Sequence, residues 1–128
     1  MQSDPQALVL AYLEAFEQQQ FDRVSALLAP DVEFQGPASA LRGATEYIAA
    51  LRRLSPVLLR NEIKKTFVDG NDVCVIYDFV TDTTAGAVPT VEWHTIADGR
   101  IRSIWLFFDR LAFQPVREEL ARRARDAS

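Results

Sequence analysis

The chain has 128 residues, of which 48% are hydrophobic and 25% are charged, with a net charge of −4 and a pI near 4.9. These values are ordinary for one globular domain spanning residues 1–128, and the negative charge argues against a nucleic-acid partner. No run approaches the ~18 apolar residues of a membrane span, so no membrane partner is expected. The single cysteine, Cys74, excludes an internal disulfide, and together with an N-terminus that lacks a basic leader it favours a cytoplasmic location.

Two helices are predicted at the start of the chain. The first begins at Pro5, with Ser3 or Asp4 as its N-cap. The second is capped by Asp22 and stopped by Pro30. Apolar residues at helical spacing give the first helix one buried stripe, which comprises Leu8, Ala11, Tyr12, Ala15 and Phe16.

A short strand and a third helix come next. Residues 31–35 alternate apolar and polar side chains, which is typical of a strand or an extended edge. Gly43 leads into the third helix, which Ser55-Pro56 closes because the residue before proline disfavours helical dihedrals. Its apolar side chains are Tyr47, Ile48, Leu51 and Leu54.

The second half of the chain is predicted to be mostly β. Residues 57–68 and 73–82 have strand composition, and two apolar runs flank Asp98-Gly99, a dipeptide that favours a tight hairpin turn. The result is an α+β domain in which four antiparallel strands curve around three helices. Residues 114–126 add a polar C-terminal helical tail, with Val116 and Leu120 as its large apolar residues.

This order of elements resembles the nuclear transport factor 2-like superfamily, particularly its SnoaL-like and ketosteroid-isomerase-like members. The most specific similarity lies in YLEAFEQQQFDRVSALLAPDVEF, in the helix start at Gly43 and in HTIADGRIRSIWLFFD, and it extends over residues 6–113. The resemblance implies a cone-shaped, cystatin-like α+β roll, a ligand cavity at its mouth and a homodimer formed through the outer sheet face. The resemblance predicts the fold much better than the function, because the superfamily contains isomerases, cyclases, hydrolases, dehydratases and binding proteins.

Carried over residue by residue, the resemblance gives a mixed catalytic set. Tyr12 falls on the oxyanion tyrosine of the ketosteroid isomerases, and Glu92 falls near their protonated acid. Gly36 stands where their general base should be, and a glycine cannot accept a proton. Leu106 stands where the epoxide hydrolases of this fold carry an acid. The isomerase and hydrolase mechanisms by those routes are therefore not expected.

Other polar residues could replace the missing base. The similarity places Asp78 on the inward face of its strand, alongside Ile76. If the following loop is centred at residues 85–86, antiparallel pairing brings Asp78 opposite His94, the only histidine of the chain. Asp78 would then orient the imidazole, and a desolvated Glu92 could remain protonated and donate a hydrogen bond.

This site depends on the register of the last hairpin. A two-residue turn at Asp98-Gly99 and a three-residue turn with a bulge put opposite faces of the strand inward. The inward orientation of Glu92 and His94 is favoured. Structural roles stay open as well, since Tyr12 on an apolar stripe could be a core residue and Asp78 could simply satisfy a neighbouring donor.

Three functions fit the sequence. The first is a cofactor-independent isomerase, cyclase or dehydratase that acts by general acid/base catalysis on a small apolar carbonyl compound, with Tyr12, Asp78, Glu92 and His94 as catalytic residues. The others are a non-catalytic binding module and a plain dimerisation domain. A metal site is not expected, because one histidine with scattered acids lacks ligand spacing. The residues expected to contact a small apolar ligand are Phe16, Phe34, Tyr47, Leu51, Ile76, Leu106 and Phe108.

Overall fold

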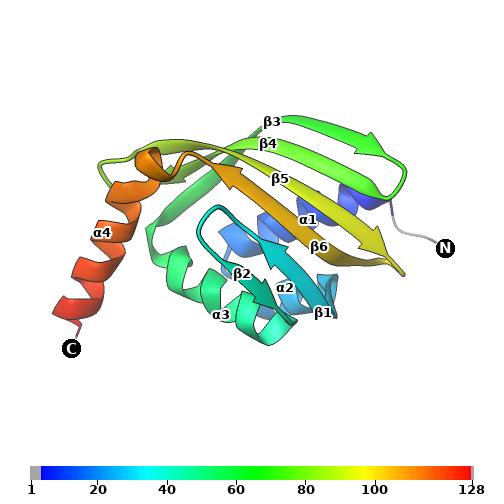
Figure 1. Ribbon diagram of the computed structural model, residues 1–128, viewed down its shortest axis with the longest axis horizontal. Coiled ribbons are helices and arrows are strands. Elements are labelled where there is room, and N and C mark those ends of the chain that lie inside the picture. The colour runs from blue at the N-terminus through cyan, green and yellow to red at the C-terminus, as the bar shows by residue number, and fades with distance from the viewer. Residues whose placement is uncertain (1–3, 128) are drawn as a thin grey trace.

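Over residues 4–127, which the structure describes, a computed structural model has four α-helices and a six-stranded curved sheet (Figure 1). The strand order is β2-β1-β6-β5-β4-β3. The α+β roll predicted from the sequence is confirmed. The elements are α1 Pro5–Glu17, α2 Phe21–Leu27, β1 Leu28–Gln35, β2 Ala40–Arg42, α3 Ala44–Leu54, the 3-10 turn η1 Ser55–Val57, β3 Leu58–Asp69, β4 Asp72–Thr81, β5 Ala87–Ala97, β6 Arg100–Phe108 and α4 Arg110–Asp126.

The first two helices differ from expectation only at their ends. Asp4 caps α1, and its Oδ1 accepts a hydrogen bond from the Gln6 amide at 3.3 Å; Ser3 lies outside the described residues. Helix α2 ends at Leu27, before Pro30 is reached, and Asp22 lies inside its first turn and not at its cap. There it still favours the helix, because a carboxylate near an N-terminus is stabilised by the helix dipole.

The sheet has two features that the sequence did not predict. Strand β2 consists of three residues and pairs antiparallel with β1, whereas β1 and β6 run parallel. All other neighbours are antiparallel. Strand β3 forms one edge of the sheet, and its pairing with β4 shifts register twice, between Leu58 and Arg60 and between Ile63 and Lys65.

The last hairpin has the tight turn that its sequence indicates. Asp98 and Gly99 form a two-residue turn with positive φ values of 54° and 73°. A register shift follows Thr95, where β6 contributes one extra residue. Beyond it, the side chains of Glu92 and His94 are both buried on the concave face, as the favoured register predicts.

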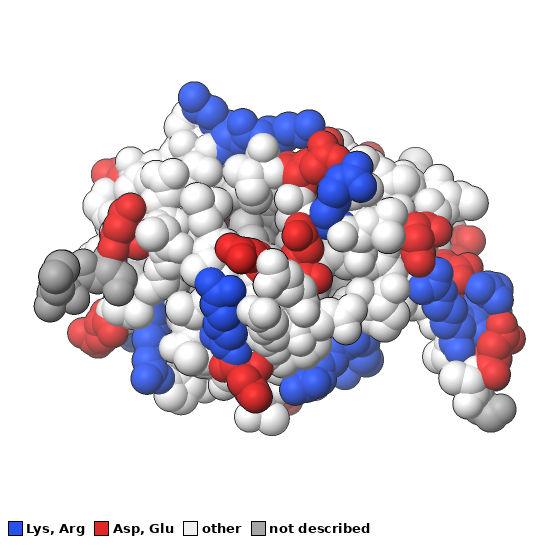
Figure 2. Space-filling view, turned by 180° about the vertical axis from the view of Figure 1, so that it is seen from behind, with Lys and Arg blue, Asp and Glu red and all other residues white. Residues whose placement is uncertain are grey.

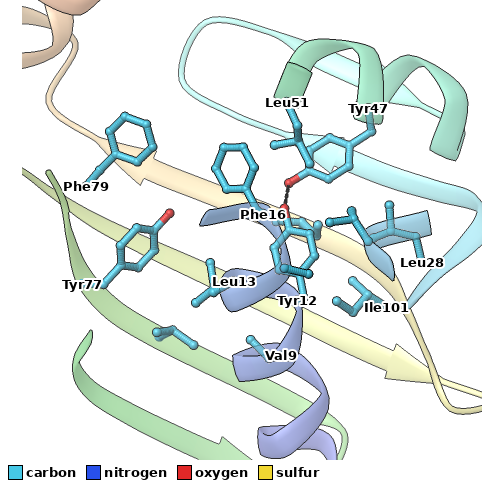
Figure 3. Packing of buried hydrophobic residues seen from close by; sticks show 14 of the residues in the cluster. Val9, Tyr12, Leu13, Phe16, Leu28, Tyr47, Leu51, Tyr77, Phe79 and Ile101 are labelled. Atoms are coloured by element: carbon cyan, nitrogen blue, oxygen red, sulfur yellow. Dashed lines mark hydrogen bonds between the residues drawn. The ribbon is translucent and has the colours of Figure 1, made fainter. Parts of the chain in front are cut away.

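The concave face of the sheet packs against the helices (Figure 1). Buried side chains of α1, α3 and the strands meet there, and Figure 3 shows Tyr12 of α1 and Tyr47 of α3 pointing toward each other. The opposite face of the sheet carries large exposed apolar side chains, among them Phe67, Trp93 and Trp105. The two faces of the sheet therefore differ in what covers them, although both carry large apolar side chains.

Helix α4 is docked against the end of the sheet, and it begins four residues before the expected tail. Asp109 caps it, and its Oδ1 accepts a hydrogen bond from the Leu111 amide at 2.9 Å. The Phe113 ring lies 4.6 Å from the Phe108 ring, and Val116 is fully buried. These contacts fix the first half of α4 to the core.

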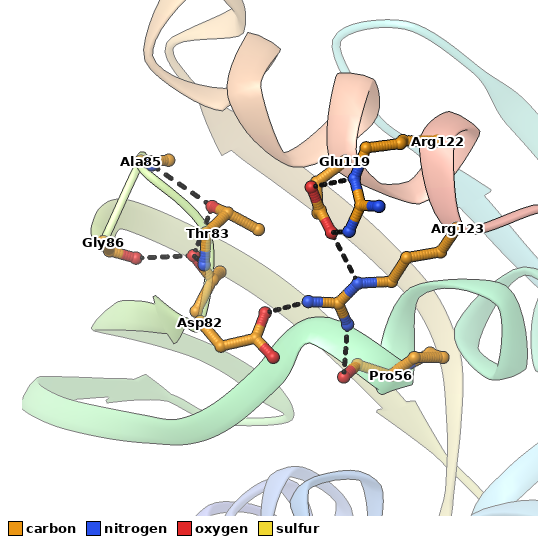
Figure 4. Close-up of polar contacts among 9 residues, drawn as sticks. Pro56, Asp82, Thr83, Ala85, Gly86, Glu119, Arg122 and Arg123 are labelled. Atoms are coloured by element: carbon orange, nitrogen blue, oxygen red, sulfur yellow. Dashed lines mark hydrogen bonds and ion pairs between the residues drawn. The ribbon is translucent and has the colours of Figure 1, made fainter. Parts of the chain in front are cut away.

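Polar contacts hold the second half of α4 (Figure 4). The Arg123 guanidinium donates to Asp82 at 2.8 Å and to the Pro56 carbonyl at 3.3 Å, which joins α4 to the ends of β4 and η1. Glu119 accepts from both Arg122 and Arg123. Seen from behind, basic and acidic side chains lie next to one another along this projecting helix (Figure 2). Among the described residues, no helix combines the length and hydropathy needed to cross a membrane.

Candidate functional site

A cavity of about 220 Å³ lies between the concave face of the sheet and the helices. Its walls are mostly apolar, and six of the seven residues expected to contact a ligand line it; these are Phe16, Phe34, Tyr47, Leu51, Leu106 and Phe108. The exception is Ile76, which belongs to the opposite face of β4. Helices α1 and α3, strands β4–β6, the loop before β2 and helix α4 all contribute to the lining.

Three tyrosines bring hydroxyl groups to this cavity. The Tyr12 and Tyr47 hydroxyls are hydrogen-bonded to each other (Figure 3), and the Tyr77 hydroxyl donates to Oε2 of Glu92. Tyr12, Tyr47, Tyr77 and Glu92 all line the cavity. An otherwise apolar space therefore has a cluster of polar groups, an arrangement typical of small-molecule sites.

His94 supports Glu92 from within the core. Its Nε2 lies 2.8 Å from Oε1 of Glu92, its ring meets the Tyr12 ring edge-on at 5.4 Å, and the side chain is fully buried. Its Nδ1 has no hydrogen-bond partner among the described residues. His94 does not line the cavity, so Glu92 is the member of this pair that a ligand would contact.

The tyrosine hydroxyls are held in their protonated form. Burial raises the pKa of Tyr12 well above 10.0, with further increases from Tyr47 and from Glu92. Burial, followed by the nearby Glu92, also raises the pKa of Tyr47 and the pKa of Tyr77. Protonated hydroxyls in a desolvated site are suited to donate hydrogen bonds to an oxygen on which negative charge develops.

The predicted orientation of Asp78 is wrong. Strand β4 pairs Asp78 with Pro89 instead of His94, and the Asp78 carboxylate lies on the outer face, 3.5 Å from Nζ of Lys64. Ile76 points outward for the same reason, because alternate residues of a strand face opposite sides. The loop between β4 and β5 is centred near residue 84 and not at residues 85–86. The pairing partners therefore differ from the expected ones by an odd number of residues, and such a shift turns the opposite face of the strand inward.

The inward residue that the sequence did not single out is Tyr77. It pairs with Thr90, and both side chains are buried and line the cavity. A signal for it existed, since Val73, Val75, Tyr77 and Phe79 form one wholly apolar and aromatic alternate set, whereas the other set contains the acid. The lining residues Arg110, Phe113 and Arg117 were also missed, because α4 begins earlier than its polar part suggested.

Gly36 lines the cavity at the position where the resemblance expects a general base. A Cβ atom there would lie 3.0 Å from Cζ of Phe34, so the aromatic ring occupies the space of the absent side chain. The described residues contain no group of three His, Cys, Asp or Glu side chains that could hold a metal ion. Glu92 is the one carboxylate among the lining residues of the described chain.

Comparison with known proteins agrees with this fold. The family model of the SnoaL-like domain matches residues 9–104, which confirms the resemblance seen in the sequence. A crystal structure from Kribbella flavida DSM 17836 is 28% identical, with a TM-score of 0.79 over 95% of this chain and 96% of that one. An NTF2-like protein of unknown function from Cytophaga hutchinsonii ATCC 33406 is 25% identical, with a TM-score of 0.76 over 88% of this chain and 97% of that one.

A third solved structure is similar in fold alone. It is a candidate polyketide cyclase from Sinorhizobium meliloti, 20% identical, with a TM-score of 0.73 over 79% of this chain and 94% of that one. No curated protein matches the chain.

Proposed function

The chain belongs to the SnoaL-like domain family, and we propose that it catalyses proton transfer at carbon next to a carbonyl group in a small, largely apolar compound. The reaction class is that of an isomerase, cyclase or dehydratase that needs no cofactor. One observation carries the proposal: a single carboxylate, Glu92, faces an apolar cavity while buried partners hold both of its oxygens.

Glu92 is the proposed general base. We assign the neutral His94 tautomer with its proton on Nε2. This tautomer donates to Glu92, and the nitrogen that it leaves unpaired, Nδ1, is an acceptor and not a donor. The carboxylate then accepts hydrogen bonds from Tyr77 and His94 and keeps further lone pairs for a substrate proton. His94 is a positioning residue in this scheme. The sequence-based role of Asp78 is withdrawn, and Glu92, which the sequence analysis expected to stay protonated and donate, is proposed here as the base.

Tyr12 and Tyr47 are the proposed oxyanion donors. As Glu92 takes the proton from carbon, the electron pair of that C–H bond shifts toward the carbonyl oxygen and forms an enolate. One of the two hydroxyls is free to donate to this oxygen while it accepts from the other. When the substrate has a β,γ double bond, the enolate is a dienolate. Return of the proton from Glu92 to the γ-carbon then moves the double bond to the α,β position and re-forms the carbonyl, so that all atoms and charges balance.

A binding protein without catalysis is the second candidate. The observation that favours it is Gly36, whose missing side chain leaves no base at the position used by the ketosteroid isomerases, with the Phe34 ring filling the space. The same cavity would then hold an apolar ligand, and Glu92 would serve only to bind a hydroxyl group.

Dimerisation through the outer sheet face forms part of the proposal. The Trp93 and Trp105 rings stack with their centroids 6.3 Å apart, and Phe107 continues the stack at 6.4 Å from Trp105. The three side chains remain 42%, 43% and 49% exposed. A contiguous aromatic surface of this kind is typical of protein–protein interfaces, and a second copy of the chain offers the same surface in return.

Deuterium exchange separates the two candidates. 2-Tetralone, a two-ring ketone, is incubated with the protein in deuterium oxide, and loss of its α-proton signals is followed by NMR alongside line broadening that reports binding. Exchange above the buffer rate supports the enzyme. Binding without exchange supports the binding protein. A ketone that neither binds nor exchanges contradicts the pocket proposal.

A further inference from the structure

Two arginines lie at the mouth of the cavity. Arg110 and Arg117 of α4 both line it, and they are seven residues apart, which places them on the same face of the helix with Phe113 between them. Arg110 lies two residues after the end of β6, beyond the cap residue Asp109. The last residue of β6, Phe108, pairs with Thr90, whereas Glu92 lies two residues farther along β5. The cations and the carboxylate thus belong to different parts of the lining.

These two arginines differ from others on the same helix. Arg122 pairs with Glu119 and Asp126, and Arg123 pairs with Glu119 and Asp82. No hydrogen bond or ion pair joins the side chain of Arg110 or of Arg117 to another residue of the described chain, although both residues belong to the α4 helix. Two arginine side chains therefore line an apolar cavity, and their guanidinium donors are not engaged by other residues of the described chain.

We infer that the ligand is amphipathic, with an apolar body and a carboxylate that Arg110 and Arg117 bind at the cavity mouth. The guanidinium group matches a carboxylate with two parallel N–H donors, and the cavity walls suit the apolar body. The carbonyl or hydroxyl end would then reach Glu92 and the tyrosines. This inference rests on the proposed function, because it concerns the same cavity.

The position of α4 supports recognition by these arginines. Phe113 packs on Phe108, Val116 is fully buried, and Arg123 is bonded to Asp82, so the helix backbone that carries Arg110 and Arg117 is held in place. Both arginine side chains are exposed, which limits the gain from each ion pair. The expected effect is consequently a moderate preference for an acid over its neutral analogue.

A pair of probes tests the inference. 2-Naphthol has an aromatic body and one hydroxyl group, and 6-hydroxy-2-naphthoic acid adds a carboxylate at the opposite end. Dissociation constants for both are measured by fluorescence titration at neutral pH. The wild-type protein is expected to bind the acid about tenfold more tightly, the usual scale for one favourable charged contact. High salt should reduce this ratio, because exposed charges are screened.

Variants locate the preference. In the Arg110→Gln/Arg117→Gln double variant the ratio of the two dissociation constants should fall close to one. Arg125→Gln removes the same charge from the same helix at a residue outside the cavity lining, and it should keep the wild-type ratio. A ratio that survives in the double variant overturns the assignment to these arginines.

The outcomes for the inference and the proposed function are distinct. Equal affinity of the wild-type protein for the two probes overturns the anionic-ligand inference and leaves the apolar pocket standing. Failure of both probes to bind contradicts the pocket itself. A preference that depends on Arg110 and Arg117 and weakens with salt supports the inference.

Discussion

Nε2 of His94 lies 2.8 Å from Oε1 of Glu92, two residues earlier on the same strand. Strand geometry produces this contact, because alternate residues of β5 project from the same face of the sheet. The carboxylate faces the cavity while the imidazole lies wholly inside the core. The orientation of the Glu92 carboxylate in the cavity therefore depends on how the His94 ring is packed in the core.

Removing the charge of Glu92 should abolish proton transfer. Glu92→Gln keeps the shape and one acceptor oxygen for His94, while its amide nitrogen can donate to the Tyr77 hydroxyl, but an amide is not a base. Deuterium exchange into 2-tetralone should fall roughly 10²- to 10⁴-fold, the usual contribution of a general base. Asp78→Asn is the matched control, since that carboxylate lies on the outer face, and it should exchange at the wild-type rate. Equal losses in the two variants would count against Glu92.

The Glu92–His94 contact should also contribute to the free energy of unfolding. His94→Leu leaves Glu92 with one donor fewer in a buried setting, and we expect a loss of about 1–3 kcal/mol in the free energy of unfolding measured with urea. Glu92→Leu also removes the acceptor of the Tyr77 hydroxyl, so the cycle is measured in a Tyr77→Phe background. There, replacing both partners by apolar groups leaves no unpaired group, and Glu92→Leu/His94→Leu should recover part of the loss. Strict additivity of the two single changes would show that the contact contributes nothing.

The tyrosines should not ionise until the protein unfolds. Tyr12, Tyr47 and Tyr77 are the three tyrosines of the chain, and burial raises the pKa of each above 10.0. Because the folded state holds these protons more tightly, stability is fully present below pH 10 and is lost as pH rises beyond it. Absorbance of tyrosinate at 295 nm should therefore rise together with loss of the circular dichroism of the fold. A tyrosinate signal in the folded protein near pH 10 would contradict the burial of these hydroxyls.

Charge on the outer sheet face should prevent association. Trp105→Lys places a cation inside the stack formed with Trp93 and Phe107, and burying an unpaired charge is costly. Sedimentation equilibrium should report a dimer for the wild-type protein and a monomer for the variant. Leu111→Lys is the control, because Leu111 is 75% exposed but lies on α4, and it should remain dimeric. A monomeric wild-type protein would refute the proposed dimer.

The second half of α4 should respond to acid through Glu119. Hydrogen bonds from Arg122 and Arg123 lower the pKa of Glu119 to about 2. A lowered pKa means that the contribution of Glu119 to the folded state is present above its ordinary value of 4.5 and is lost as pH falls toward about 2. Carbon NMR of the Glu119 carboxyl should show this midpoint, and Arg123→Gln should raise it. Arg125→Gln should leave the midpoint unchanged.

The elements of the fold could be predicted because their signals are local. Helix stripes, the cap at Asp4 and the Asp98-Gly99 turn each depend on neighbouring residues, and each appears in the structure where it was expected. Strand β2 has only three residues and carries no periodicity. The parallel pairing of β1 with β6 joins segments about 70 residues apart, and no local pattern encodes it.

The site was only partly predictable for a related reason. Both faces of β4 carry apolar residues, although one alternate set, Val73 to Phe79, is wholly apolar and aromatic, and the resemblance favoured the other set. The prediction then depended on the assumed centre of the β4–β5 loop. That assumption placed Asp78 on the inward face and Tyr77 on the outward face, whereas the structure has them the other way round. Glu92 and His94 face inward, as favoured, but the turn alone does not set their partners, because the extra β6 residue beyond Thr95 moves the partner of Glu92 to Leu106.

The two register shifts of β3 bear on how the molecule behaves at high concentration. An edge strand of twelve residues with free backbone groups is a template onto which the sheets of other molecules could add, one after another. Each shift interrupts the regular spacing of those groups, and Lys64 and Lys65 place positive charge beside the second shift. Growth of a continuous intermolecular sheet, and with it fibre formation, is thereby opposed at this edge.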